Sequence, residues 1–292
     1  MMRRFGMSKP TFNEFLRDNE ATIWRKSSDK HRGEALSRCH KFAEFRGYGD
    51  MRLREFKRND LHVYMDHLVT AKGLSEATAN RHLVAVSAVF KAACNEELIK
   101  RPLRAELYKE DRHRMRVFSD TEVDKIIRLL RSSDTPWMAD MATLSLNTGM
   151  RLGEVVKVIT GEAELEIDQD GFGWIWLKET KNGDPRYVPL NDDSRAACER
   201  LRAIKRPFNW ATAQKAFYTT WNSVREKVAP RDKEFVFHVF RHTAATKMAN
   251  DLNLNSAVIA LMLGHRDTAT TAKYIKIKTA TMKEVARQMK QA

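Results

Sequence analysis

The sequence predicts a mainly α-helical fold with a small antiparallel β-sheet, divided between two domains. Glycine and proline are scarce, with 12 and 7 among 292 residues, which disfavours turn-dense all-β folds and low-complexity chains. Apolar residues recur at helical spacing over most of the chain, and the period changes to the alternation of strands only within residues 165–190. A basic stretch without apolar periodicity, residues 101–116, separates the two domains.

The first domain is expected over residues 1–100 and is predicted to be helical. Thr11 and Glu14 have the spacing of a capping box at the start of a helix. Ser75 is a candidate N-cap of a longer helix that starts at residue 76. One side of that helix carries an apolar stripe made of Leu83, Val86, Phe90 and Ala93. Three basic residues fall outside the stripe and give this amphipathic helix a basic side: Arg81, His82 and Lys91.

Residues 101–116 contain a proline and many Lys and Arg side chains, and we expect them to form an exposed interdomain linker. The second domain, residues 117–292, begins with a capping-box pair, Ser119 and Glu122, before an amphipathic helix. Three strands are expected at residues 165–169, 173–180 and 186–190, with Asp170-Gly171 and Asn182-Gly183 at the bends. From Phe237 onward the pattern is helical again, so this domain is predicted to be α+β.

The charge of the chain indicates a polyanionic partner. There are 52 Lys and Arg against 38 Asp and Glu, a net charge of +14, and +9 of this excess falls within residues 1–116. Nucleic acid is therefore the leading class of ligand, and a basic surface that serves solubility alone is the alternative. No apolar run is long enough for a membrane span, and the first residues lack the hydrophobic segment of a signal peptide. We therefore expect no membrane partner and a cytoplasmic location.

Two stretches of the second domain carry residues suited to chemistry at a phosphate. Arg151 follows a glycine turn at the start of a helix, with Glu154 three residues later on the same side. His265 directly follows a glycine that is expected to end a helix, and Tyr274 comes nine residues after it. Each feature alone has an ordinary structural explanation: an ion pair on a helix surface, a capping histidine or a packed tyrosine.

A further stretch, residues 238–242, offers Arg241 between two histidines. His238 and His242 are four residues apart, as in a zinc-binding helix, but the glutamate of an HExxH motif is missing and no third ligand is suitably spaced. The three cysteines are scattered, which disfavours a zinc knuckle or a disulfide framework and fits a reducing compartment. The sequence has neither a dense acidic cluster for two metal ions nor a GxxxxGK[ST] stretch, so we expect no metal, no ATP and no other cofactor.

Together and in this order, these stretches resemble the tyrosine recombinases, also called the phage integrase family. The family signature is a T-G-x-R-x-x-E box, a lysine in a β-turn, an H-x-x-R-H box, an L-G-H box and a tyrosine shortly after. In this chain the signature corresponds to residues 148–154, Lys181, residues 238–242, residues 263–265 and Tyr274. The similarity covers residues 117–292, and in the first domain the helix from residue 76 resembles the last major helix of the family's core-binding domain.

The resemblance implies a site-specific DNA recombinase that cuts and rejoins duplex DNA through a 3′-phosphotyrosine intermediate without metal or ATP. The catalytic residues that it implies are Arg151, Lys181, His238, Arg241, His265 and Tyr274, with Glu154 orienting them. Guanidinium groups suit this chemistry because their planar forks match the oxygens of a phosphoryl transition state. Tyr274 is then the nucleophile, and Lys181 donates a proton to the leaving oxygen, with Lys178 on the preceding strand as the alternative donor.

The partners implied by the resemblance are double-stranded DNA with specific recombination sites, a homotetramer on that DNA and accessory DNA-bending proteins. Arg81, His82 and Lys91 are the candidate DNA contacts of the first domain. Two other functions remain open. One is a type IB topoisomerase with the same chemistry, and the other is a DNA-binding protein that has lost catalysis.

A short C-terminal helix is expected after the tyrosine, at residues 281–290. Thr281 and Glu284 form a capping pattern, and one apolar face follows from the spacing of Met282, Val285, Ala286 and Met289. Helices under about 12 to 15 residues are marginal in water, so this one requires a packing partner. That partner is either its own domain or, as the resemblance implies, a neighbouring protomer.

Overall fold

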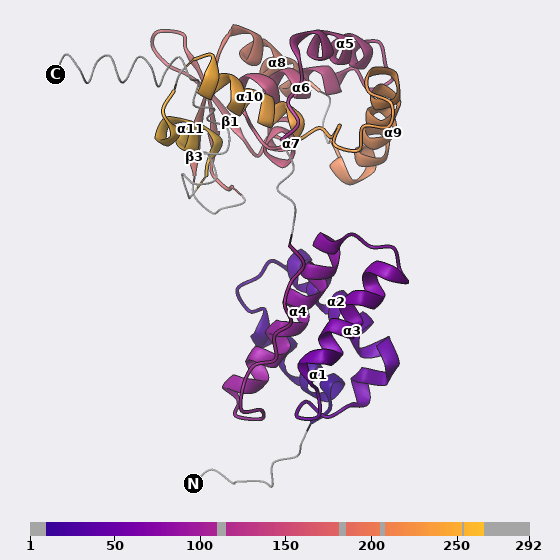
Figure 1. The fold of residues 1–292 in the computed structure, drawn as a ribbon. Helices are drawn as coiled ribbons and strands as arrows, with labels where there is room; N and C mark the ends of the chain where they lie inside the picture. Colours follow the sequence, from indigo (N-terminus) through magenta and orange to yellow (C-terminus); the bar gives the residue numbers. More distant parts are fainter. Residues whose placement is uncertain (1–9, 110–114, 181–184, 205–207, 253, 266–292) are drawn as a thin grey trace, which may run out of the picture. The chain divides into compact units, whose positions relative to one another are not determined.

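The computed structural model describes residues 10–109, 115–180, 185–204, 208–252 and 254–265. The chain divides into two compact units, residues 1–113 and 114–292 (Figure 1). Each unit has its own hydrophobic core. The predicted fold class is confirmed, because helices dominate both units and the strands of the described residues form a small antiparallel sheet in the second unit. Within the described ranges, no helix combines the length and the apolar composition needed to cross a membrane.

The first unit is built from α1 (Phe12–Ile23), α2 (Asp29–Glu44), a short helical segment η1 (Phe45–Asp50), α3 (Arg58–Thr70) and α4 (Glu76–Asn95). Both predicted helix starts are confirmed. Thr11 and Glu14 exchange hydrogen bonds before α1, and the Ser75 hydroxyl accepts the N–H of Thr78 at the start of α4. These bonds satisfy backbone N–H groups that have no partner inside the helix.

The apolar stripe of α4 lies in the core of this unit. All four of its predicted members are fully buried: Leu83, Val86, Phe90 and Ala93. Phe12 from α1 and Phe42 from α2 pack with Phe90, with ring centroids 5.0–6.5 Å apart. Because one side of α4 is fixed in this core, residues on the opposite side face the solvent.

The expected linker is largely part of the first unit, which corrects its predicted extent. Three of its side chains pack against the first core: Leu103, Ala105 and Tyr108. The backbone of Tyr108 also exchanges two hydrogen bonds of 2.9 Å with the side-chain amide of Asn80 on α4. At the other end, Arg116 already binds Glu122 and Asp232 of the second unit. The remaining residues, 110–114, lie outside the described ranges.

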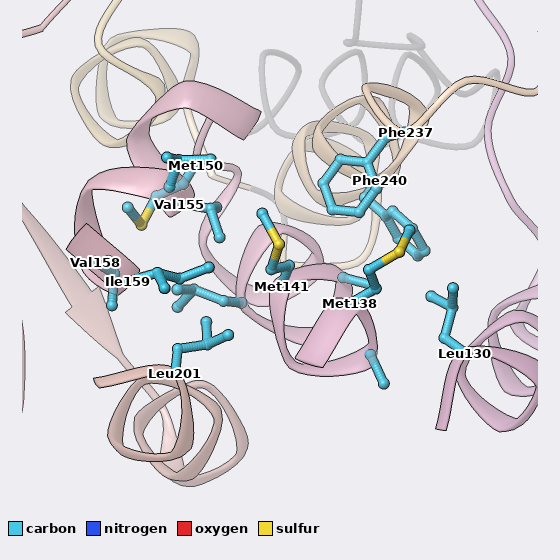
Figure 2. Packing of buried hydrophobic residues seen from close by; sticks show 14 of the residues in the cluster. Leu130, Met138, Met141, Met150, Val155, Val158, Ile159, Leu201, Phe237 and Phe240 are labelled. Atoms are coloured by element: carbon cyan, nitrogen blue, oxygen red, sulfur yellow. The ribbon is translucent and has the colours of Figure 1, made fainter. Parts of the chain in front are cut away.

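The second unit is organised around a buried central helix, α6. Its helices are α5 (Asp120–Arg131), α6 (Trp137–Thr148), α7 (Leu152–Thr160), α8 (Asp192–Arg202), α9 (Trp210–Val228), α10 (Val239–Asn250) and α11 (Ser256–Leu263). Figure 2 shows Met138 and Met141 of α6 among apolar side chains from α5, α7, α8 and α10. A helix with buried residues on all sides belongs in the interior, and α6 therefore fixes the positions of the helices that carry the candidate site.

The sheet has the order β1-β2-β3, with β1 (Glu164–Ile167), β2 (Gly173–Leu177) and β3 (Arg186–Leu190) all antiparallel. The three predicted strands are confirmed, although β2 ends at Leu177, so that Lys178 lies just beyond the strand. The bend at Asp170-Gly171 is present, with Gly171 at φ +79°, and Asn182-Gly183 lies outside the described ranges. One face of the sheet packs on the core and the other is outward, as the alternation of strand residues requires.

Candidate active site

Arg151 lies between α6 and α7, at the turn that the sequence predicts. Gly149 ends α6 with φ +70°, a conformation that favours glycine, and a Cβ atom there would lie 2.4 Å from Cδ2 of Leu263. The backbone N–H of Arg151 donates to Oε2 of Glu154 at 2.8 Å, and the guanidinium donates to Oε1 at 3.0 Å. The predicted pair is therefore present, and it holds Arg151 at the start of α7.

Glu154 is held from its other side by Arg186, which the sequence analysis missed. Arg186 opens β3 and donates to both carboxylate oxygens of Glu154, at 2.9 and 2.8 Å, and both side chains are 6% exposed. Burial alone would raise the pKa of Glu154, but hydrogen bonds and charge from Arg186, and then from Arg151, hold that pKa at about 2. Glu154 is thus an ionised carboxylate that positions Arg151. The sequence did contain a signal for this position. Arg186 alternates along β3 with Val188 and Leu190, and alternate residues of a strand lie on the same, here buried, face of the sheet.

Arg241 is 2% exposed and binds the C-terminal ends of two helices. Its Nη1 donates to the carbonyl of Gly149 after α6 at 2.6 Å, and its Nη2 donates to the carbonyl of Leu263 at the end of α11 at 2.8 Å. Such carbonyls lack intrahelical partners and carry partial negative charge, so they suit a buried guanidinium. Arg151 donates to the carbonyls of Leu263 and Gly264, at 3.4 and 3.3 Å. The two arginines therefore meet at the C-terminus of α11.

His265 joins the arginines at this point. Gly264 ends α11 with φ +65°, as predicted, and a Cβ atom there would lie 2.7 Å from Nη1 of Arg186. Nε2 of His265 is 2.9 Å from Nη2 of Arg241. Because a guanidinium can only donate, Nε2 accepts this hydrogen bond and a neutral ring carries its proton on Nδ1. The structure thus brings Arg151, Arg241 and His265 into one cluster.

His238 lies at the N-cap position of α10 and is exposed, one helical turn before Arg241. Its ring packs edge-on against that of His242, with centroids 4.7 Å apart. In the part of the chain that the structure describes, no group of three or more His, Cys, Asp or Glu side chains is arranged to hold a metal ion.

Two predicted catalytic residues, Lys181 and Tyr274, lie outside the described ranges, as do residues 281–290 of the expected C-terminal helix. Lys181 is the first undescribed residue after β2, and the alternative donor, Lys178, is exposed just beyond the end of that strand. In the sequence, Tyr274 comes nine residues after His265, the histidine that contacts Arg241.

The outward side of α4 in the first unit carries two of the three candidate DNA contacts. Arg81 and Lys91 are exposed, and Val84, which lies between them on the same side of the helix, is 60% exposed. Basic side chains beside an exposed methyl-bearing side chain are the groups that contact phosphates and base edges in a DNA groove.

His82 is not on this exposed side, which corrects the prediction for this residue. It is 4% exposed, and its Nδ1 lies 3.0 Å from the hydroxyl of Tyr64 on α3. Burial, followed by the positive charges of Lys41 and Arg38, lowers the pKa of His82 to about 4. The helical spacing identified the apolar stripe correctly. However, packing against α2 and α3 buries a face of α4 that is wider than this stripe, and His82 lies on that wider buried face.

Two family models match the chain, with limits close to those of the structural units. Residues 116–281, more than half of the chain, match the phage integrase family, and residues 11–108 match the phage integrase SAM-like domain. These two matches cover both halves of the fold described above.

Individual relatives agree with the family models. The tyrosine recombinase XerD of Oceanobacillus iheyensis is 23% identical over 281 residues, covering 82% of this chain and 92% of the relative. The tyrosine recombinase XerA of Saccharolobus solfataricus is 22% identical over 210 residues, covering 70% of this chain and 65% of the relative, less than two thirds of its length. Among solved structures, the Tn1549 transposon integrase in complex with a circular intermediate DNA has a TM-score of 0.72 at 15% identity, covering 96% of this chain and 99% of that chain. The fold, the arginine cluster and the family models agree, and the chain belongs to the phage integrase family, the tyrosine recombinases.

Proposed function

We propose that this chain is a site-specific recombinase that cuts and rejoins duplex DNA through a 3′-phosphotyrosine intermediate, without metal or ATP. The observation that carries the proposal is the convergence of Arg151, Arg241 and His265 on the end of α11, nine residues before Tyr274. Three phosphate-binding side chains from separate elements are thereby assembled directly before the proposed nucleophile.

The arginines stabilise the negative charge that develops on the phosphate oxygens in the transition state. A phosphodiester under attack carries charge on its non-bridging oxygens, and fixed guanidinium donors interact with it without reorganising. Arg241 is fixed by the carbonyls of Gly149 and Leu263, and Arg151 is fixed by Glu154, which Arg186 holds ionised. The role of Glu154 in fixing Arg151 explains why a buried carboxylate lies in a cluster that binds an anionic phosphate.

The covalent step exchanges one phosphoester for another. The Tyr274 phenol gives its proton to His238 or to water and attacks phosphorus, the bond to the 5′ oxygen breaks, and that oxygen takes a proton from Lys181 or, as the alternative, Lys178. The neighbouring positive charges lower the cost of forming the phenolate. His238 acts as a proton shuttle or phosphate donor, and His265 donates through Nδ1. A 5′ hydroxyl of another strand then attacks the phosphotyrosine, which conserves the bond energy and requires no ATP.

The first unit is proposed to be the core-binding domain, which contacts duplex DNA through the outward side of α4. Arg81 and Lys91 neutralise phosphates or reach base edges, whereas buried His82 supports the helix from inside. The net charge of +14 supports the same partner. The complete reaction requires four protomers on two DNA sites, with accessory DNA-bending proteins as further partners, and it takes place in the cytoplasm.

The test is a nicked suicide substrate carrying the recognition site, obtained by selecting bound sequences from random DNA. The wild-type chain is expected to form a covalent protein–DNA adduct that is resolved on a denaturing gel. Tyr274→Phe, which removes only the hydroxyl, should bind the same DNA and form no adduct. An adduct in that variant would disprove the assignment of the nucleophile.

The absence of an adduct in the wild type would favour a non-catalytic DNA-binding protein, and relaxation of supercoils without strand exchange would favour a topoisomerase.

A further inference from the structure

A pocket lies in the first unit between the end of α2, η1, α3 and the start of α4. Its volume is about 620 Å³, which is within the range of pockets that hold small organic molecules. Phe45, Leu68 and Leu74 supply an apolar wall. Arg81 and Lys91, on the outward side of α4, do not line it, so the pocket is distinct from the proposed DNA contact.

The lining of the pocket is rich in positive charge. Lys41 from α2, Arg46 from η1 and Lys72, just after α3, all line it, and Glu44 is the one acidic residue among the described lining residues. In the described part of the chain, none of these three basic side chains has an ion-pair partner. A concave surface that gathers charges of one sign focuses their field and attracts ions of the opposite sign. The pocket therefore suits an anionic ligand.

Arg46 is held at the pocket by an unusual backbone conformation. It has φ +53°, and Gly47 follows with φ +69°. Residues other than glycine rarely adopt this left-handed region, and those that do are concentrated at functional sites such as ligand clamps. The turn places Cζ of Arg46 5.2 Å from the ring centroid of Phe45, and that ring lies 4.7 Å from the ring of His67. The pocket thus combines a positioned cation with a flat aromatic wall.

His82 also lines the pocket, although the residue is only 4% exposed. Its Nδ1 lies 3.0 Å from the Tyr64 hydroxyl. Within the described ranges every fully enclosed side-chain nitrogen and oxygen has a hydrogen-bond partner, whereas Nε2 of His82 has none there, so Nε2 opens onto the pocket. When the Tyr64 hydroxyl donates to Nδ1, the neutral ring carries its proton on Nε2. The buried ring then presents an N–H donor to a ligand.

We propose that this pocket binds a small phosphate monoester of nucleotide size. Lys41, Arg46 and Lys72 bind the phosphate oxygens, Nε2 of His82 donates to the ligand, and the ring of Phe45 contacts its organic part.

The charge of the pocket favours a monoester over the backbone of DNA. Three cations and the carboxylate of Glu44 leave a surplus of two positive charges. A phosphate monoester carries a charge of about −2 at neutral pH, whereas each phosphodiester of DNA carries a single negative charge. The site therefore adds a ligand of low molecular weight to the partners of the proposed function.

Calorimetric titration of the full chain without DNA tests the site, with adenosine 5′-monophosphate as the probe. We expect one saturable site per chain. Adenosine, which lacks the phosphate, should bind at least about tenfold more weakly because the charge-assisted hydrogen bonds are lost. Arg46→Asn with Lys72→Gln should weaken nucleotide binding at least about tenfold for the same reason, and asparagine tolerates the left-handed backbone at position 46. Lys26→Gln with Lys30→Gln, an equal loss of exposed charge on the same unit, is the matched control and should have little effect.

A further variant separates binding inside the pocket from attraction to a charged surface. Leu74→Phe enlarges a half-buried wall residue and leaves every cation in place, so it should also weaken nucleotide binding. Thermal melting establishes that each variant is folded. Unchanged affinity in a folded Leu74→Phe protein would contradict binding inside the pocket.

Three other results would overturn the proposal: no nucleotide binding by the wild type, equal affinity for adenosine and its monophosphate, or unchanged affinity in Arg46→Asn with Lys72→Gln. Loss of DNA affinity in that double variant, without any nucleotide binding by the wild type, would assign the cations to the DNA backbone instead. Adduct formation on the suicide substrate reports the proposed recombination separately, so an active chain that does not bind the nucleotide would disprove the pocket alone.

Discussion

Arg241 shows how a nearly buried charge is tolerated in this site. The guanidinium, 2% exposed, has lost most of its hydration, and the C-terminal carbonyls of α6 and α11 replace water as acceptors. The arrangement costs little reorganisation when a phosphate arrives, because the side chain is already immobile. The same contacts make Arg241 a structural element that joins two helices.

At the residue scale, we predict that Arg151→Ala and Arg241→Ala each lower the rate of adduct formation by a factor on the order of a hundred or more, with a smaller effect on DNA binding. Arg241→Ala should also lower the free energy of unfolding, by about 1–3 kcal/mol, because it leaves buried carbonyls unsatisfied. Single-turnover cleavage, DNA titration and thermal melting separate these effects. Near wild-type cleavage by either variant would remove that residue from the site.

The buried His82 predicts a pH-dependent stability. Its pKa is lowered from 6.5 to about 4, so between these values the unfolded chain binds a proton that the folded chain does not. Stability from the neutral ring is complete above about pH 6.5 and is lost as the pH falls toward 4.

The variant His82→Gln keeps a group that can bond to Tyr64 but does not titrate. We expect the melting temperature of the wild type to fall more steeply than that of His82→Gln as the pH falls from 6.5 to 4. Circular dichroism melts across this range measure the difference. Parallel curves for the two proteins would show that folding does not lower the pKa of His82.

At the element scale, α4 has two sides with different tasks. The core side fixes the helix through the stripe that includes Val86 and Phe90, and the outward side presents Arg81, Val84 and Lys91. A rigid helix holds such side chains at fixed spacing, which a groove-binding surface requires.

We predict that Arg81→Ala or Lys91→Ala weakens DNA binding and lowers the slope of log affinity against log salt by about one for each phosphate that the variant no longer neutralises. Fluorescence anisotropy titrations at several salt concentrations measure this slope. Arg17→Ala on α1, whose side chain is 74% exposed, is the control and should leave the slope unchanged. An unchanged slope in both α4 variants would place the DNA-binding surface elsewhere on the first unit.

At the scale of the whole molecule, the charge is divided unevenly. The net charge of +14 draws the chain to DNA, while residues 162–170 form a local acidic region.

In the proposed mechanism, the positive charge at the phosphate comes from arginine and lysine side chains. We therefore predict that adduct formation by the wild type proceeds at an unchanged rate in excess EDTA. The measurement is the suicide-substrate assay with and without chelator. Loss of the adduct on chelation, restored by Mg²⁺, would mean that a metal ion supplies the charge.

The sequence by itself determined the local features of this protein. Three kinds of local feature are present as predicted: the capping residues Thr11, Ser75 and Ser119, the bend at Asp170-Gly171, and the Arg151–Glu154 pair. Each joins residues only a few positions apart, so helix and turn geometry fix the contact as soon as the residue types are known. The family signature likewise selected Arg241 and His265 as candidates by residue type and order, and the structure places the two side chains in contact at the end of α11.

Only the tertiary structure decided the contacts between distant segments. Arg186 reaches Glu154 across 32 positions, and Arg241 reaches the carbonyl of Gly149 across 92. The burial of His82 and the attachment of residues 103–108 to the first unit also depend on packing between helices and not on the local period. Spacing along the chain determines which side of an element is apolar, but how wide a face is buried, and which distant group a buried charge binds, depends on where the other elements pack.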